Sequence, residues 1–154
     1  MEITERIAGF AVNFCVGLRI RRAKIALVVL VAFLIALVAL ADSGHGQWLF
    51  RLARQVPAGD KAGHCVLFGA LSFLVNLILR AATLNLGRIA IRKGSTIVMS
   101  IVTLEEFSQL FFRSRTFDLG DLAADLVGIC VCGWLARKYL EWKRGTPTAV
   151  AKTL

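Results

Sequence analysis

Ionisable and amide side chains occur in this sequence where the flanking residues are apolar enough to lie in a membrane. They form three groups along the chain, which are Asp60, Lys61 and His64; Glu105, Glu106 and Gln109; and Arg113, Arg115, Asp118, Asp121 and Asp125. One charge at the centre of a transmembrane helix costs about 2.5 to 3.5 kcal/mol on insertion, so these residues need partners, water or a ligand. We therefore take them as the candidate functional residues.

Proton transfer and anion binding are the chemistry that these residue types favour. We expect His64, Glu106 and Asp121 to be the catalytic residues if the protein acts on a ligand, because imidazole and carboxylate groups exchange protons. The other candidates would contact the ligand, and guanidinium groups would hold phosphate oxygens through paired donors. This ligand-binding set comprises Asp60, Lys61, Gln109, Arg113, Arg115, Asp118 and Asp125.

A divalent cation is an alternative partner for the same groups. Carboxylate oxygens and imidazole nitrogens are typical ligands of magnesium, manganese and zinc. The residues that would supply them are Asp60, His64, Glu106, Asp121 and Asp125. The sequence leaves the presence of a metal open, since Asp and Arg side chains can neutralise one another without one.

The composition indicates the class of protein that carries these groups. Hydrophobic residues make up 57% of the 154 positions, and the mean hydropathy is +0.69, which is typical of small multi-pass membrane proteins. The net charge of +9 comes from basic residues scattered between apolar segments. Since no basic stripe with interleaved aromatic residues accompanies them, nucleic acid is not an expected partner.

Four apolar segments are long enough to be transmembrane helices, and they predict an all-α bundle of four spans. They cover residues 24–41, 63–83, 95–112 and 119–135. The first could also be a signal peptide, because Ala39 and Ala41 stand at the spacing of a cleavage site, but its length favours a retained anchor. We expect residues 1–23 to contain an interfacial helix, and residues 47–54 to form a short amphipathic helix on the outer surface.

Basic residues between the spans predict the orientation. They precede the first span, join the second to the third and follow the fourth, so the positive-inside rule places both termini in the cytoplasm. The candidate residues then lie at the outer ends of the second, third and fourth spans. Residues 24–144 would form the transmembrane domain, and residues 145–154 a disordered tail.

Helical periodicity brings the candidates onto shared faces. Asp60 and His64 are four residues apart, and Asp118, Asp121, Asp125 and Gly128 form a similar stripe. Gly128 would let a neighbouring helix approach closely. We expect these stripes to line one cavity on the outer side. Structural roles remain open for three residues, since Asp60 and Asp118 could cap helices and Lys61 could extend to the headgroups.

Three ordered motifs in the last two-thirds of the chain resemble the VanZ-like membrane protein family. They are Asp60-Lys61-x-x-His64, Glu106-x-x-Gln109, and Arg115-x-x-Asp118-x-x-Asp121 followed by Gly128. The resemblance implies a multi-pass protein of the bacterial inner membrane and favours Glu106 over Glu105 as the site residue. It also implies a link to glycopeptide resistance, because the family takes its name from low-level resistance to teicoplanin. Asp125 departs from the pattern, since the family usually has Asn there.

These observations predict an extracytoplasmic cavity that binds or modifies an anionic envelope lipid, such as a phospholipid headgroup or a polyprenyl phosphate. No serine or cysteine motif typical of covalent catalysis accompanies it, so whether the protein is an enzyme stays open. Two alternatives come from other classes. The protein could be a small transporter or proton relay that uses Glu106 and His64, or a non-catalytic scaffold whose polar residues hold the helices together.

Overall fold

The computed structural model describes residues 2–43, 58–111 and 118–145 of the chain. Its elements are α1 (Glu2–Asp42), α3 (Gly59–Ile78), β1 (Thr83–Leu86), β2 (Ile89–Arg92), α4 (Lys93–Ser108), the short 3-10 helix η1 (Gln109–Phe111) and α5 (Leu119–Gly145). The amphipathic helix expected at residues 47–54 and the tail expected from residue 146 onward lie outside the described residues.

Three helices are long and apolar enough to cross a membrane, which indicates a membrane protein. They are Val16–Leu40, Gly59–Ile78 and Leu119–Lys143, with mean hydropathies of 2.9, 1.5 and 1.6. The 16 residues of α4 extend about 24 Å at 1.5 Å per residue. This is shorter than the hydrocarbon thickness of about 30 Å. The predominantly helical fold is confirmed, and the fourth span remains a prediction.

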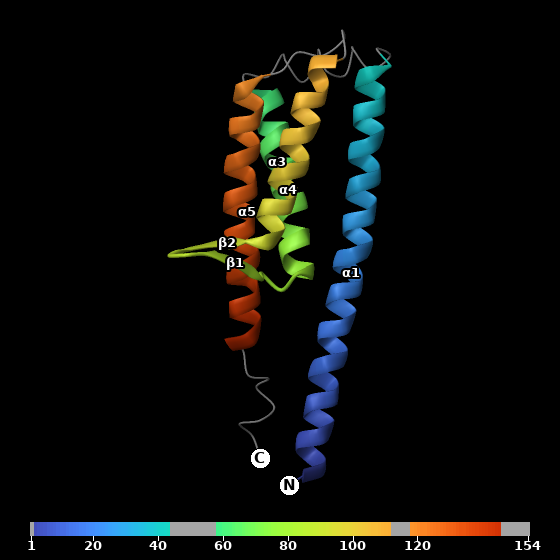
Figure 1. The fold of residues 1–154 in the computed structure, drawn as a ribbon. Helices are drawn as coiled ribbons and strands as arrows, with labels where there is room; N and C mark the ends of the chain where they lie inside the picture. Colours follow the sequence, from blue (N-terminus) through green and yellow to red (C-terminus); the bar gives the residue numbers. More distant parts are fainter. Residues whose placement is uncertain (1, 44–57, 112–117, 146–154) are drawn as a thin grey trace.

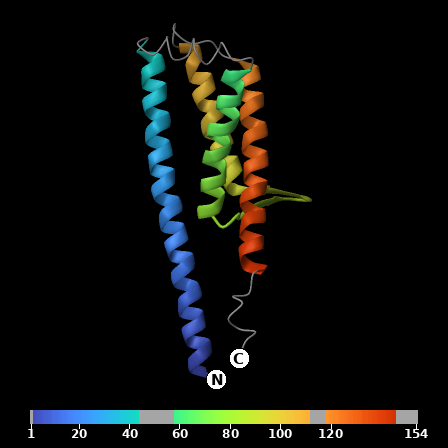
Figure 2. The same ribbon diagram turned by 180° about the vertical axis from the view of Figure 1, so that it is seen from behind.

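The helices lie side by side with their long axes roughly aligned (Figures 1 and 2). Helices α3 and α5 run in the same direction and share the most extensive interface, and α4 runs in the opposite direction beside them. The buried core comprises Leu71, Val98, Val102 and Ile129. Helix α1 packs Leu27, Leu30 and Leu34 against this core.

Helix α1 is one continuous helix of 41 residues, whereas the sequence suggested an interfacial helix within residues 1–23 followed by a separate span. The two segments join because the intervening Arg19, Arg21, Arg22 and Lys24 are strong helix formers. At 1.5 Å per residue the helix is about 62 Å long, so only part of it fits within a bilayer. The apolar window begins at Val16.

A β-hairpin joins α3 to α4, and it was not predicted from the sequence. Helix α3 ends at Ile78 rather than near Thr83, and the antiparallel strands β1 and β2 follow. Gly87 opens the two-residue loop with a φ of 62°, a value that glycine adopts without the strain that a side chain would add. The alternation of polar and apolar residues in Thr83–Leu86 and the glycine that follows it were the available signal.

Glycine allows the close contact between α3 and α5 that brings the candidate residues together. A Cβ atom at Gly128 would collide with the backbone carbonyl oxygen of Cys65. A Cβ at Gly69 would lie 3.1 Å from the carbonyl oxygen of Gly128. The expectation that Gly128 admits a neighbouring helix is therefore confirmed, and the two backbones meet directly below the polar residues.

Candidate polar site at one end of the bundle

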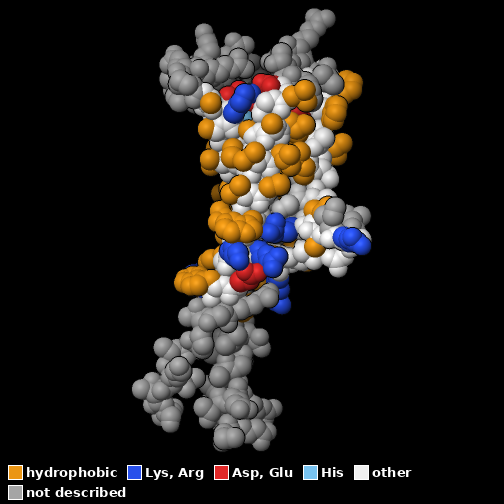
Figure 3. Space-filling model, turned by 90° about the vertical axis from the view of Figure 1, so that its left-hand side faces the viewer, with side chains coloured by type: hydrophobic (Ala, Val, Ile, Leu, Met, Phe, Trp, Pro, Cys, Tyr) orange, Lys and Arg blue, Asp and Glu red, His pale blue; other side chains and the backbone are white. Residues whose placement is uncertain are grey.

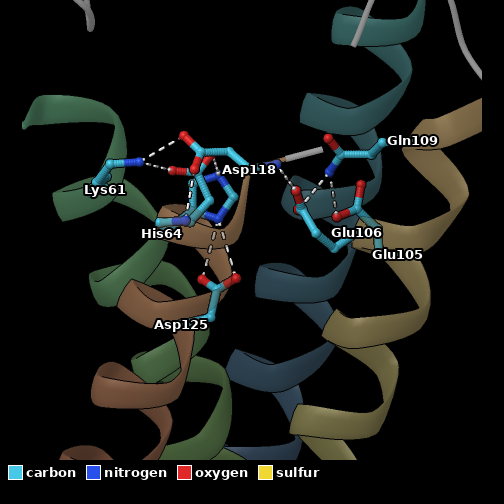
Figure 4. A network of polar contacts seen from close by, with 9 residues as sticks. Lys61, His64, Glu105, Glu106, Gln109, Asp118 and Asp125 are labelled. Atoms are coloured by element: carbon cyan, nitrogen blue, oxygen red, sulfur yellow. Dashed lines mark hydrogen bonds and ion pairs between the residues drawn. The ribbon is translucent and has the colours of Figure 1, made fainter. Parts of the chain in front are cut away.

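The candidate residues meet where α3 and α5 begin and α4 ends (Figure 4). In the close-up, Lys61 and His64 extend from α3 toward acidic residues of α5, and Glu105, Glu106 and Gln109 lie together on the opposite side. Three segments that are distant in sequence therefore form one network. We refer to this network as the polar site.

Lys61 bridges two carboxylates of α5. Its Nζ atom donates to Asp118 Oδ2 and to Asp121 Oδ1, each at 2.8 Å. The side chains of Lys61 and Asp118 are 43% and 50% exposed, whereas that of Asp121 is 14% exposed. Hydrogen bonding to the Lys61 ammonium, with a second bond from the Gly120 N–H, lowers the pKa of Asp118. The outer part of the site is therefore an exposed, charge-paired rim.

Asp118 also fixes the start of α5. Its Oδ1 atom accepts the backbone N–H of Gly120 at 2.6 Å, which is the hydrogen bond of an N-cap residue. The capping role suggested from sequence is thus confirmed for Asp118. It is wrong for Asp60, because α3 has Ala58 at its N-cap and Asp60 lies in the first turn.

His64 has a carboxylate near each of its two ring nitrogens. The Nδ1 atom lies 3.2 Å from Asp125 Oδ1, and the Nε2 atom lies 4.0 Å from Asp121 Oδ2. The side chain of Asp125 is fully buried, and that of His64 is 21% exposed. Asp125 therefore fixes the orientation of the imidazole, while Nε2 faces the half-open side of the site beside Asp121.

Glu106 joins α4 to α5 from a buried position. It is only 1% exposed, and its Oε1 atom accepts the backbone N–H of Asp118 at 3.0 Å. Its Oε2 atom accepts from Gln109 Nε2 at 2.8 Å, and the same amide nitrogen lies 3.2 Å from Glu105 Oε2. Both carboxylate oxygens of Glu106 are thus bonded within the protein. The side chain belongs to the buried part of the polar site, which we call its floor.

The structure brings most of the predicted residues into this single network. Arg113 and Arg115 lie outside the described residues. Asp60 stands next to Lys61 at the start of α3 and makes no hydrogen bond or ion pair with another residue of the described ranges. Among the described residues the network contains more carboxylates than cations, so its buried part favours positive charge, and the exposed Lys61 is the cation that an approaching anion would meet.

A second polar cluster, which was not predicted from the sequence, lies farther along the same helices. The Ser72 hydroxyl donates to the backbone oxygen of Ile129 at 3.0 Å, and Asn76 Nδ2 donates to Ser95 Oγ at 3.0 Å. Ser72 and Asn76 are fully buried. Their spacing of four residues within an apolar segment was the signal. The cluster links α3, α4 and α5 through uncharged groups.

The described residues contain no group of three or more His, Cys, Asp or Glu side chains arranged to hold a metal ion. Instead, Lys61 occupies the space between Asp118 and Asp121, and His64 is bonded to Asp125. Ion pairing with Lys61 and hydrogen bonding with His64 thus account for the closest contacts of these carboxylates.

Comparisons with protein-family models, with curated proteins and with solved structures give no match for this chain. Its function is therefore inferred from the geometry of the polar site and from the sequence motifs.

Proposed function

We propose that this protein is a four-span, VanZ-like protein of the bacterial inner membrane whose polar site binds the phosphate group of an anionic envelope lipid. The ligand would be a phospholipid headgroup or a polyprenyl phosphate in the outer leaflet. The observation that carries the proposal is the Lys61 ammonium, which is held by two carboxylates and remains 43% exposed at the end of an apolar bundle. A cation that is held in place and accessible at the end of an apolar bundle is suited to bind a headgroup phosphate.

The distribution of charge supports the orientation. Most of the visible Lys and Arg side chains gather at one end of the apolar band, together with an acidic group, and further acidic side chains lie at the other end beside a basic one (Figure 3). The positive-inside rule assigns the basic end, which includes Arg19 and Arg137, to the cytoplasm. Helix α4 would be the fourth span, with η1 continuing it toward the outer surface. The polar site then faces the outer leaflet.

Electrostatics restrict where a phosphate can bind. The buried carboxylates Glu106 and Asp125 repel an anion from the floor. The rim offers Lys61, and Arg115 precedes the rim residue Asp118 by three positions in the sequence. We assign the phosphate to Lys61, Arg113 and Arg115, and we assign Glu106 a positioning role.

His64 is the group best placed to exchange a proton with such a ligand. Its Nδ1 atom is oriented by Asp125, so its Nε2 atom is the one that remains toward Asp121 and the rim. An imidazole held in this way serves as a general acid or base when a substrate hydroxyl or phosphate lies within hydrogen-bond reach. Chemical modification of the lipid would use this atom.

The resemblance to the VanZ-like family links the proposal to glycopeptide resistance. A site that faces the outer leaflet would act on the side of the membrane that an antibiotic from outside the cell meets first. Binding of an envelope lipid is the step that this protein would contribute to resistance.

The geometry favours lipid binding over transport. A proton relay needs titratable groups through the bundle, but the hydrogen-bonded cluster deeper in the helices consists of Ser72, Asn76 and Ser95, none of which titrates in the physiological range. A pure scaffold would gain little, since interhelical hydrogen bonds in membranes average about 0.6 kcal/mol. An exposed Lys61 also adds little to helix packing.

The test is a binding titration of the purified full chain, followed by native mass spectrometry. Polyprenyl phosphate is compared with polyprenol, which has the same chain without the phosphate. We expect the protein to retain polyprenyl phosphate and not polyprenol. Lys61→Gln and Arg115→Gln should each weaken binding of polyprenyl phosphate about five-fold or more, because one cation at an anionic lipid contributes about 1 kcal/mol.

Lys143→Gln is the matched control, because Lys143 is an exposed cation at the opposite end of α5. Its affinity for polyprenyl phosphate should equal that of the wild type. Equal retention of polyprenol and polyprenyl phosphate, or unchanged binding in both rim variants with a normal circular dichroism spectrum, would exclude a phosphate site.

A further inference from the structure

The β-hairpin projects sideways from the bundle, far from the polar site (Figures 1 and 2). Its register pairs Leu84 with Ile91, so the two side chains lie on the same face of the hairpin. They are 40% and 39% exposed. An isolated two-stranded hairpin is marginally stable in water. Some apolar surface must therefore cover this face.

A groove of about 440 Å³ lies between the hairpin and α4. Its lining residues are Leu84, Lys93, Thr96, Ile97, Ser100 and Ile101. Lys93 is the first residue of α4, whereas Ile97 and Ile101 lie one and two turns further toward the apolar band. Both isoleucines are largely exposed, at 47% and 56%. The groove thus has a cation at its hairpin end and apolar walls beyond it.

The order of these groups matches a phospholipid, whose charged headgroup is followed by acyl chains. The backbone groups at the hairpin edges need water, which excludes the hairpin from the hydrocarbon core and places it at the membrane interface. The exposed basic residues in the hairpin or next to it in the sequence are Arg80, Arg88 and Lys93. Their charge favours an anionic headgroup over a zwitterionic one.

We propose that the hairpin lies in the headgroup region of the leaflet opposite the polar site and, together with α4, binds one anionic phospholipid. The phosphate contacts Lys93, and an acyl chain lies in the groove against Ile97 and Ile101. Leu84 and Ile91 face the membrane. This site requires only that the helices cross the membrane, and it is independent of the ligand bound at the polar site.

The test measures phosphatidylglycerol and phosphatidylcholine binding to the full chain by native mass spectrometry. Lys93→Gln removes the cation, and Ile97→Trp fills the groove without changing charge. We expect the wild type to bind phosphatidylglycerol more tightly than phosphatidylcholine. Lys93→Gln should lower the affinity for phosphatidylglycerol about five-fold, which is the contribution of one basic residue at an anionic surface. Ile97→Trp should reduce binding to a similar extent.

Two controls separate the groove from the rest of the surface. Val28→Trp alters a lipid-facing position of α1 that is 68% exposed, and Lys61→Gln alters the polar site. Val28→Trp should retain the wild-type binding of phosphatidylglycerol, and Lys61→Gln should leave the labelling of lipid from a photo-crosslinker at position 97 unchanged, so loss of one site can be told from loss of the other. The proposal is overturned if phosphatidylcholine binds equally well, or if Lys93→Gln binds as the wild type does. Photo-crosslinking from position 97 should label lipid, and labelling of a second copy of the chain would overturn it as well.

Discussion

The buried carboxylate of Glu106 accepts the backbone N–H of Asp118 at 3.0 Å, which ties the last full turn of α4 to the start of α5. Gln109 donates to the other oxygen of the same carboxylate. The contact therefore holds the polar site together from below, and both oxygens of Glu106 are bonded within the protein.

Replacing Glu106 should destabilise the fold rather than only weaken ligand binding. Glu106→Ala leaves the N–H of Asp118 and the amide of Gln109 without their buried acceptor, at an expected cost of about 1 to 3 kcal/mol. Glu106→Gln retains one acceptor and should cost less. Unfolding in detergent, followed by circular dichroism, measures both. Glu141→Gln, in an exposed pair with Arg137, should change stability by less than about 0.5 kcal/mol. Equal stability of Glu106→Ala and the wild type would contradict the role of this carboxylate.

The pairing of His64 with Asp125 can be measured by a double-mutant cycle. His64→Ala leaves the fully buried Asp125 carboxylate without its partner, and breaking a buried ion pair in this way costs about 3 to 5 kcal/mol. Asp125→Asn should be milder, because the amide can still bond the imidazole. We expect the double variant to recover much of the loss and the coupling energy to be about 2 kcal/mol. A coupling near 0.6 kcal/mol, the average for interhelical hydrogen bonds in a membrane, would indicate a neutral pair instead.

Replacing either of two glycines of the same bundle by alanine should change the stability of the protein in opposite directions. A Cβ at Gly128 meets the backbone of Cys65, which cannot move without separating α3 from α5, so Gly128→Ala should cost about 1 to 3 kcal/mol. A Cβ at Gly63 would meet nothing within 4 Å, and alanine there should stabilise the helix by up to about 1 kcal/mol. Thermal unfolding of the two variants provides the comparison. Stabilisation by Gly128→Ala would contradict the close helix contact.

Acid should remove the contribution of Asp118 to stability. Because its pKa in the folded protein is lowered, chiefly by Lys61, its contribution is fully present above the unfolded pKa of about 3.9 and is lost as the pH falls through the lower folded value. Asp118→Asn keeps a good capping residue but removes the charge. The difference in unfolding midpoint between wild type and variant should therefore shrink below about pH 4. A constant difference down to about pH 2 would show that the charge of Asp118 makes no contribution.

Much of the polar site could be predicted from spacing, because helical periodicity relates residues within one helix. Asp121 and Asp125 share a face of α5, and three of the four apolar segments correspond to helices long and apolar enough to cross a membrane. The specific partners across helices could not be predicted. The choice of Asp118 and Asp121 for Lys61 depends on the register of α3 against α5. That register is set by Gly69 and Gly128, whose pairing no single-helix pattern reveals.

The hairpin and the uncharged cluster were missed for different physical reasons. Thr83–Leu86 and Ile89–Arg92 are only four residues each, and such short alternations are easily read as the end of an apolar helix and a basic loop. Ser72 and Asn76 carry no charge, so their cost in a membrane is small enough that they do not interrupt an apolar segment. Both features were visible only once the helix ends and the helix contacts were known.

The parallel contact of α3 with α5 also determines the order in which the protein can be assembled. A ribosome completes α3 before α4 and α5 exist, so Lys61 and His64 are synthesised before Asp118, Asp121 and Asp125. Until α5 has been made, Lys61 lacks its two carboxylate partners and His64 lacks Asp125. The polar site is therefore completed late in synthesis, and until then the surface of α3 that carries these residues depends on other partners, such as chaperones or lipid.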